Sequence, residues 1–178
     1  MLRFEKPDYK VVEYDETNFY GKFVLEPLER GFGTTIGNAL RRVMLSSLPG
    51  SAIKSIKIDG VLHEFQKIDG VREDVTEIIL NLKKLVLKKF TETDKKLYLK
   101  ASKEGIVTAA DITPDADVEI INKDLVICEL SKGASINMEI LVSNGRGYVD
   151  AKINRKEMKD LEVGVIPVDS LFSPIERI

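Results

Sequence analysis

Residues 25–50 read LEPLERGFGTTIGNALRRVMLSSLPG and predict a turn followed by an amphipathic helix. Glycines on both sides of Phe32 favour the turn, because glycine adopts backbone conformations that other residues avoid. Thr34 or Thr35 can cap a helix over residues 34–48, and Pro49-Gly50 ends it. Apolar residues recur at helical spacing along one face of this helix: Ile36, Leu40, Val43, Met44 and Leu48.

The segments around this helix predict strands and one further helix. Residues 18–25 and 53–62 alternate apolar and polar side chains, which is the period of a strand. Asp69 is a suitable cap for a second helix over residues 71–86, whose apolar residues repeat at three and four. Short strands are predicted further along, over residues 96–100, 118–121, 125–130 and 136–142. A turn at 144–147 follows them, and then a last apolar segment at 163–172. This mixture predicts an α+β fold.

Composition places the chain among ordinary globular proteins. It has 178 residues, 43% of them hydrophobic and 31% charged, with a formal net charge of −2. A chain without a basic surplus holds nucleic acid only through a local patch. The start resembles no signal peptide, and no apolar run approaches the ~20 residues that span a bilayer. The single cysteine fits a reducing compartment, so we expect a cytoplasmic protein without a membrane partner.

Residues able to perform chemistry are few. His63 is the only histidine and Cys128 the only cysteine, and neither is accompanied by the other ligands that a metal site needs. We therefore interpret both as structural residues. The sequence contains no Gly-x-Ser-x-Gly nucleophile elbow, which disfavours hydrolysis by that type of enzyme.

The glycines at positions 31, 33 and 37 are one alternative site, for a nucleotide. They follow a strand and open a helix, as the dinucleotide-binding fingerprint does. The third glycine comes one residue late, however, and Pro27 separates the glycines from the strand. We keep a nucleotide-binding enzyme as a second hypothesis.

A lysine-rich run is the other alternative site, for RNA or DNA. It is followed by acidic residues and contains only Phe90 and Tyr98 as possible stacking platforms. We favour the interpretation that these lysines lie on edge strands, where their charge prevents pairing with the strands of other molecules. The lysines are Lys83, Lys84, Lys88, Lys89, Lys95, Lys96, Lys100 and Lys103.

Polar residues on the flank of the first helix suit a protein interface. Asn38 and Arg42 lie one turn apart, away from the apolar stripe, and Arg41 is adjacent to them in sequence. A guanidinium is weakly hydrated and offers a planar fork of donors, which interfaces use. The residues alone support this interpretation and that of an ordinary surface arginine pair equally.

The stretch 25–50 closely resembles the hallmark of bacterial RNA polymerase alpha subunits, in their amino-terminal domain. Further segments resemble signatures of the same family and come in the same order along the chain: residues 58–65, 70–83, 108–112, 144–148 and 173–177. The resemblance therefore covers essentially the whole chain. The resemblance implies a dimerisation domain, residues 1–49 and 165–178, interrupted by a mostly β insert domain, residues 50–164. It also implies that the family chain continues past Ile178 with a second dimerisation helix and a carboxy-terminal domain. By this resemblance, the second dimerisation helix supplies part of the apolar surface that covers the first helix.

The implied function is assembly of a transcribing enzyme. The subunit dimerises and recruits the beta and beta-prime subunits of DNA-directed RNA polymerase, a nucleotidyltransferase, without catalytic residues, cofactor, metal or direct DNA contact of its own. The resemblance assigns Arg42 to beta and Lys83 to beta-prime. We expect Asn38 and Arg41, on the same flank of the helix as Arg42, to contact beta as well. The resemblance assigns the dimer interface to apolar residues of the first helix: Phe32, Ile36, Leu40, Val43 and Met44.

Overall fold

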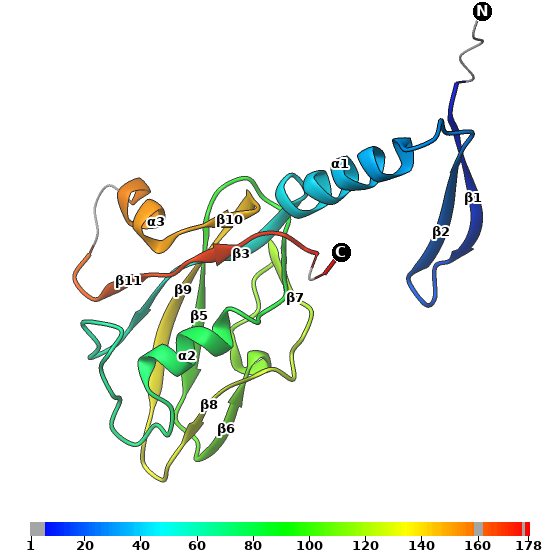
Figure 1. The fold of residues 1–178 in the computed structure, drawn as a ribbon. Helices are drawn as coiled ribbons and strands as arrows, with labels where there is room; N and C mark the ends of the chain where they lie inside the picture. Colours follow the sequence, from blue (N-terminus) through cyan, green and yellow to red (C-terminus); the bar gives the residue numbers. More distant parts are fainter. Residues whose placement is uncertain (1–5, 159–161, 176) are drawn as a thin grey trace, which may run out of the picture. The chain divides into compact units, whose positions relative to one another are not determined.

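A computed structural model describes residues 6–158, 162–175 and 177–178, and it divides the chain into two units, Met1–Val43 and Met44–Ile178. Figure 1 traces the order of the elements along the chain. The fold is α+β with mostly antiparallel strands, which confirms the predicted fold class. Within the described ranges, none of the helices is both long and apolar enough to cross a membrane.

The first unit begins with an antiparallel hairpin of β1 (Asp8–Asp15) and β2 (Tyr20–Glu26). One face carries two ion pairs, Lys10 with Glu26 and Lys22 with Glu13, each with 3.3 Å between nitrogen and oxygen. The other face carries two directly opposed apolar pairs: Tyr9 with Leu25, and Val11 with Phe23. The strand predicted over residues 18–25 is therefore present as β2, whereas β1 was not predicted.

Helix α1 (Phe32–Ser46) follows the hairpin and crosses into the second unit. It begins two residues earlier than predicted, so Thr34 and Thr35 lie in its first turn and the prediction that one of them caps the helix is wrong. Gly31, with φ +92°, gives the chain the left-handed conformation that precedes the helix. Leu48 lies beyond the last turn, and Pro49 already begins the next strand.

The second unit is built on an antiparallel sheet that contains six strands among the described residues. Its order is β5 (Lys95–Ala101), β9 (Ile136–Arg146), β3 (Pro49–Ile58), β4 (Leu87–Lys89) and β7 (Val118–Ile120), with β11 (Val165–Pro167) also paired to β3. Two smaller ladders join β6 (Gly105–Thr108) to β8 (Val126–Leu130), and β10 (Tyr148–Val149) to β12 (Ser170–Leu171). The remaining elements are α2 (Val75–Leu82), the 3₁₀ turn Ala109–Asp111 and α3 (Ala151–Glu157).

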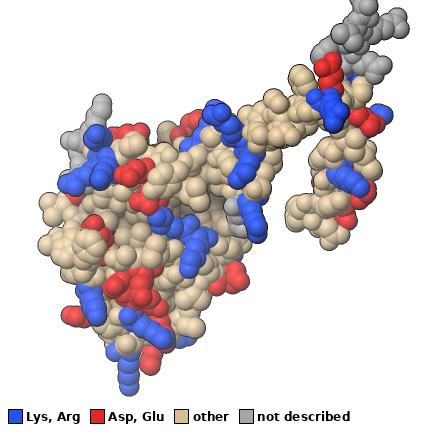
Figure 2. Space-filling view, in the orientation of Figure 1, with Lys and Arg blue, Asp and Glu red and all other residues tan. Residues whose placement is uncertain are grey.

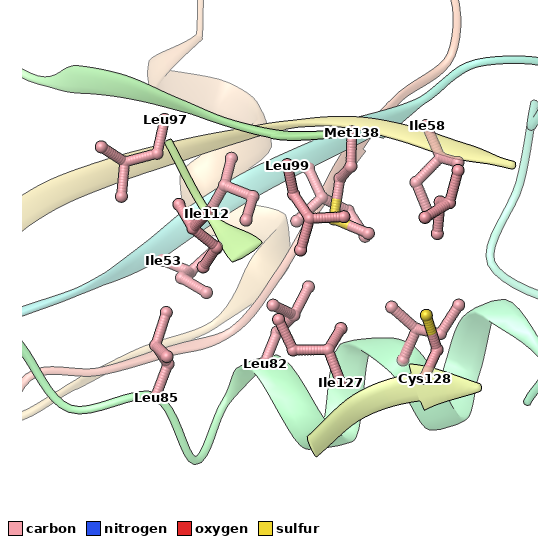
Figure 3. Close-up of a cluster of buried hydrophobic side chains, with 14 of the residues drawn as sticks. Ile53, Ile58, Leu82, Leu85, Leu97, Leu99, Ile112, Ile127, Cys128 and Met138 are labelled. Atoms are coloured by element: carbon pink, nitrogen blue, oxygen red, sulfur yellow. The ribbon is translucent and has the colours of Figure 1, made fainter. Parts of the chain in front are cut away.

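The hydrophobic core of this unit lies where α2 and β8 cover one face of the sheet. In Figure 3, side chains from the sheet point toward those of α2 and β8, with Leu99 and Ile127 fully buried between them. Burying one such side chain stabilises the fold by about 1.5–3 kcal/mol. The labelled residues of this cluster are Ile53, Ile58, Leu82, Leu85, Leu97, Leu99, Ile112, Ile127, Cys128 and Met138.

Helix α2 is shorter than the predicted helix over residues 71–86. Asp74, not Asp69, caps it: the Glu77 amide donates to Asp74 Oδ1 at 2.8 Å, and the Asp74 amide donates to Glu77 Oε2 at 3.3 Å. Val71, which we predicted to be helical, forms an isolated antiparallel bridge with Leu130. The reciprocal cap at Asp74 decides where the helix starts, because it satisfies amides that would otherwise lack partners.

The predicted turn at residues 144–147 is also displaced. Strand β9 continues through Arg146, and the chain turns at Gly147, with φ +62°. Gly50 of β3 lies opposite Gly145 of β9, and Phe172 packs over this pair. A Cβ atom on Gly145 would lie 2.7 Å from the Phe172 ring, and one on Gly50 would collide with the Phe172 backbone carbonyl, so these glycines make room for Phe172 instead of ending the strand.

Candidate functional site

Helix α1 presents an apolar stripe that the chain itself leaves uncovered. None of its residues, all of which the structure describes, is buried, and Leu40 and Val43 are 55% and 53% exposed. Phe32 and Met44 are exposed as well, and Ile36 is half-buried. An amphipathic helix normally buries such a stripe, so this surface has the character of an interface.

Asn38, Arg41 and Arg42 are brought together on α1 by the helical repeat. All three are exposed, and Asn38 and Arg42 are one turn apart. Exposed guanidinium groups beside an apolar stripe match the composition of protein interfaces, in which arginine is enriched. Lys83 belongs to another element, at the carboxyl end of α2.

The hairpin adds an apolar surface that the sequence patterns did not assign to any site. Tyr9, Val11 and Phe23 are exposed on the face opposite the ion pairs. A two-stranded hairpin is at best marginally stable in water by itself, and a covered apolar face would stabilise it. The spacing of Tyr9 and Val11 by two, repeated at Val12 and Tyr14, was the signal that could have identified the first strand, and the bulge between Val11 and Glu13 interrupts its alternation.

Lys83 is held in an ion pair. Its side-chain nitrogen donates to Oδ2 of Asp169, and the two side chains are 30% and 34% exposed. The hydrogen bond from Lys83 lowers the pKa of Asp169, so this carboxylate is ionised at neutral pH. Partial desolvation and the charge of Asp169 raise the pKa of the nearby Tyr148 hydroxyl, which therefore stays protonated.

The glycine turn does not have the setting of a nucleotide site. Strand β2, which precedes it, belongs to an antiparallel hairpin, whereas the dinucleotide-binding fingerprint requires a parallel βαβ unit. A Cβ atom added to Gly33 or Gly37 would meet nothing within 4 Å beyond its own stretch of helix, so close packing within the chain does not explain these glycines.

The lysine-rich run does not form a continuous basic patch. Lys95 pairs with Asp117, and Lys96 pairs with Glu139 at 3.3 Å. Lys89 is buried, and its Nζ donates to the carbonyls of Thr91 and Thr93 at 2.5 and 2.8 Å. Figure 2 shows positive and negative side chains interspersed over the visible face of the second unit. This arrangement favours the interpretation that these lysines are solvent-exposed or paired with carboxylates across the sheet, rather than a nucleic-acid site.

Cys128 and His63 have different settings. Cys128 is fully buried, and its pKa is raised to about 12. Desolvation is the largest cause, and the negative charges of Glu73 and Asp111 add to it. Its thiol is therefore neutral and packs as a small apolar side chain. His63 is exposed on the loop before α2. Within the ranges that the structure describes, no three His, Cys, Asp or Glu side chains converge as a metal site.

Residues 56–173, which include most of the sheet, α2 and Lys83 with Asp169, match the family model of the RNA polymerase Rpb3/RpoA insert domain. The match covers more than half of the chain and agrees with the mixed architecture and mostly β body described above. The chain therefore belongs to the RNA polymerase Rpb3/RpoA insert-domain family and is an assembly subunit of an RNA polymerase, a nucleotidyltransferase complex.

Proposed function

We propose that this chain is the alpha subunit of a bacterial-type, DNA-directed RNA polymerase, which pairs with a second copy of itself and recruits the beta and beta-prime subunits in the cytoplasm. The observation that carries this proposal is α1, a fifteen-residue helix with an apolar stripe and no buried residue. The two-part division into residues 1–49 with 165–178 and residues 50–164 belongs to the same proposal.

Self-association would cover the apolar stripe of α1. A two-fold interface is self-complementary, so Leu40 and Val43 of one copy would meet the same or adjacent residues of the other. The apolar face of the hairpin, including Phe23, is a second surface that a partner copy can cover. Burial of both surfaces would stabilise a first unit that has few buried side chains of its own.

Recruitment of the large subunits would use the polar residues. Asn38, Arg41 and Arg42 are accessible on α1 and suited to hydrogen-bonded recognition of carbonyl or carboxylate groups on beta. Lys83 would contact beta-prime from the end of α2. The interspersed charges support a role that does not include direct DNA binding.

The self-association test places a charge in the stripe. Leu40→Glu and Val43→Glu should convert a dimer to a monomer, measured by light scattering after size exclusion, in the chain and in a form extended past Ile178. Ile106→Glu is the matched control, because Ile106 is 63% exposed on β6 and is not among the proposed interface residues. Dimers that persist in both α1 variants would contradict the proposal.

The test of beta recruitment is Arg42→Ala. We expect co-purified beta to fall while the melting temperature stays nearly unchanged, because Arg42 is exposed. Arg155→Ala, at an exposed arginine of α3, is the control of the same residue type. A melting temperature lowered in parallel with beta binding would instead make Arg42 a structural residue.

A further inference from the structure

The Lys83–Asp169 pair lies at the edge of a wider surface formed by three separate segments. Lys83 ends α2, Asp169 precedes β12, and Tyr148 begins β10. Tyr148 lies directly opposite Leu171 in the β10–β12 ladder, so their side chains project on the same side. The Tyr148 hydroxyl and the Asp169 carboxylate also shift each other's pKa, Tyr148 upward and Asp169 downward, so the ladder lies beside the ion pair.

The two apolar members of this surface are exposed although the ladder that carries them is well anchored. Tyr148 is 60% and Leu171 59% exposed. The exposed tyrosine and leucine form a small apolar surface bordered by a partly desolvated ion pair, and tyrosine is enriched in protein interfaces, whose rims are polar. The recess between Lys83, Asp169 and Leu171 holds only about 20 Å³, too little for a small-molecule ligand, so the surface suits contact with a protein.

Asp169 is held in place by its neighbours in the chain. Ser170, which is buried, donates through Oγ to the Ile53 carbonyl at 2.6 Å. The Val168 amide donates to the Lys54 carbonyl at 3.0 Å, and Val168 is buried. Because the residues on both sides are fixed to β3, the Asp169 carboxylate has a defined position from which to hold the Lys83 side chain.

We propose that Lys83, Asp169, Tyr148 and Leu171 form one contact surface for beta-prime, the Lys83–Asp169 surface, in which Asp169 is a positioning residue for the Lys83 ammonium. The inference rests on the proposed function of Lys83. It identifies what beta-prime must offer: an acceptor for the remaining N–H groups of Lys83, a donor for the Asp169 carboxylate, and an apolar side chain over Tyr148 and Leu171. The ion pair carries no net charge, so attraction to a purely acidic partner is not required.

The test compares beta-prime with beta on the tagged chain after co-expression of all three proteins. Asp169→Asn should lower retained beta-prime about tenfold, as Lys83→Ala should, because each change leaves the partner of a desolvated pair without its counter-charge. The double variant should retain no less than Lys83→Ala alone, since the two residues act as one unit. Retained beta and the melting temperature should stay close to those of the unaltered chain.

Three further variants separate positioning from a structural role. Asp169→Glu keeps the charge and should restore part of the beta-prime retention that Asp169→Asn loses. Leu171→Ser should lower beta-prime retention while leaving the ion pair intact. Asp124→Asn, at an exposed acid elsewhere on the same unit, should change nothing. In Asp169→Asn, Lys83 is an uncompensated charge, so the remaining capture should become more sensitive to salt.

The outcomes distinguish this inference from the proposal on which it rests. Loss of beta-prime in Lys83→Ala, with full retention in Asp169→Asn and Leu171→Ser, would overturn the inference alone. Unchanged retention in Lys83→Ala would overturn the role of Lys83 and the inference together. Equal loss of beta and beta-prime in Asp169→Asn, with a lower melting temperature, would show that Asp169 is only structural and would also overturn it.

Discussion

Asn154→Ala perturbs the buried polar network that fixes the carboxy-terminal segment to the sheet. Asn154, on α3, is 1% exposed, and its amide donates to the Val168 carbonyl at 2.6 Å and to Ser170 Oγ at 2.9 Å. Ser170 in turn donates to the Ile53 carbonyl. The substitution therefore removes the donor from two buried acceptors at once.

The expected cost follows from those two acceptors. A buried group left without its partner costs about 1–3 kcal/mol, so two such groups give a loss of about 3 kcal/mol in the free energy of unfolding. Alanine favours the helix by about 0.5 kcal/mol relative to asparagine, which leaves a net loss of about 2.5 kcal/mol. With a urea m-value of about 2 kcal/mol/M, the midpoint should fall by about 1 M.

Urea unfolding followed by circular dichroism measures this loss. Asn137→Ala is the matched control, because Asn137 donates one hydrogen bond, to Asp59 Oδ2 at 2.6 Å, from an exposed position on β9. We expect the control to lose less than about 1 kcal/mol. Equal losses in the two variants would show that burial does not make the Asn154 network important for stability.

Three other predictions concern the core and the titratable groups of the second unit. Leu99→Ala should lower the free energy of unfolding by about 2–5 kcal/mol, because Leu99 is fully buried at the centre of the core, whereas Leu62→Ala at an exposed position should have little effect. Cys128 should react with a thiol reagent at pH 8 only after unfolding. Its pKa of about 12 in the folded chain lies above that of an unfolded thiol, so the free energy of unfolding should also fall as the pH rises above about 8.5. The Cys128→Ala variant should not show this fall. Asp169 has a lowered pKa in the folded chain, so its contribution to stability is complete above about pH 4 and is lost as the pH falls further; an acid titration of unfolding should be less steep in Asp169→Asn.

Periodicity identified the elements whose side chains alternate between core and solvent over several residues. The alternation at Ile136, Met138, Ile140 and Val142 predicted β9, and all four are buried. The four-and-three repeat from Ile36 predicted α1 even though the chain leaves that stripe uncovered. Both patterns lie within a few neighbouring residues, so they can be read from the sequence without knowing the fold. Each indicates that one face of the element is buried, whether by this chain or by a partner.

Element ends and short strands depended on interactions that periodicity does not contain. The start of α2 is set by the reciprocal cap between Asp74 and Glu77, which competes with the equally plausible cap at Asp69. Strand β4, three residues long, is too short for its pattern to be distinguished from a loop, and it exists because β3 and β7 pair with it.

The candidate site was only partly accessible from the sequence. Residues on one helix, such as Asn38 and Arg42, are neighbours by the helical repeat, so their proximity could be predicted. Lys83 and Asp169 are 86 positions apart, and only the fold brings them together. The partners of Lys83 therefore could not be predicted by reasoning from spacing.

We propose that this chain assembles an RNA polymerase through α1 and the Lys83–Asp169 surface. Native mass spectrometry of the complex formed when the chain is co-expressed with beta and beta-prime tests both surfaces at once. We expect a complex with two copies of the chain and both large subunits, which loses beta in Arg42→Ala and beta-prime in Lys83→Ala. A complex of unchanged composition in both variants would contradict it.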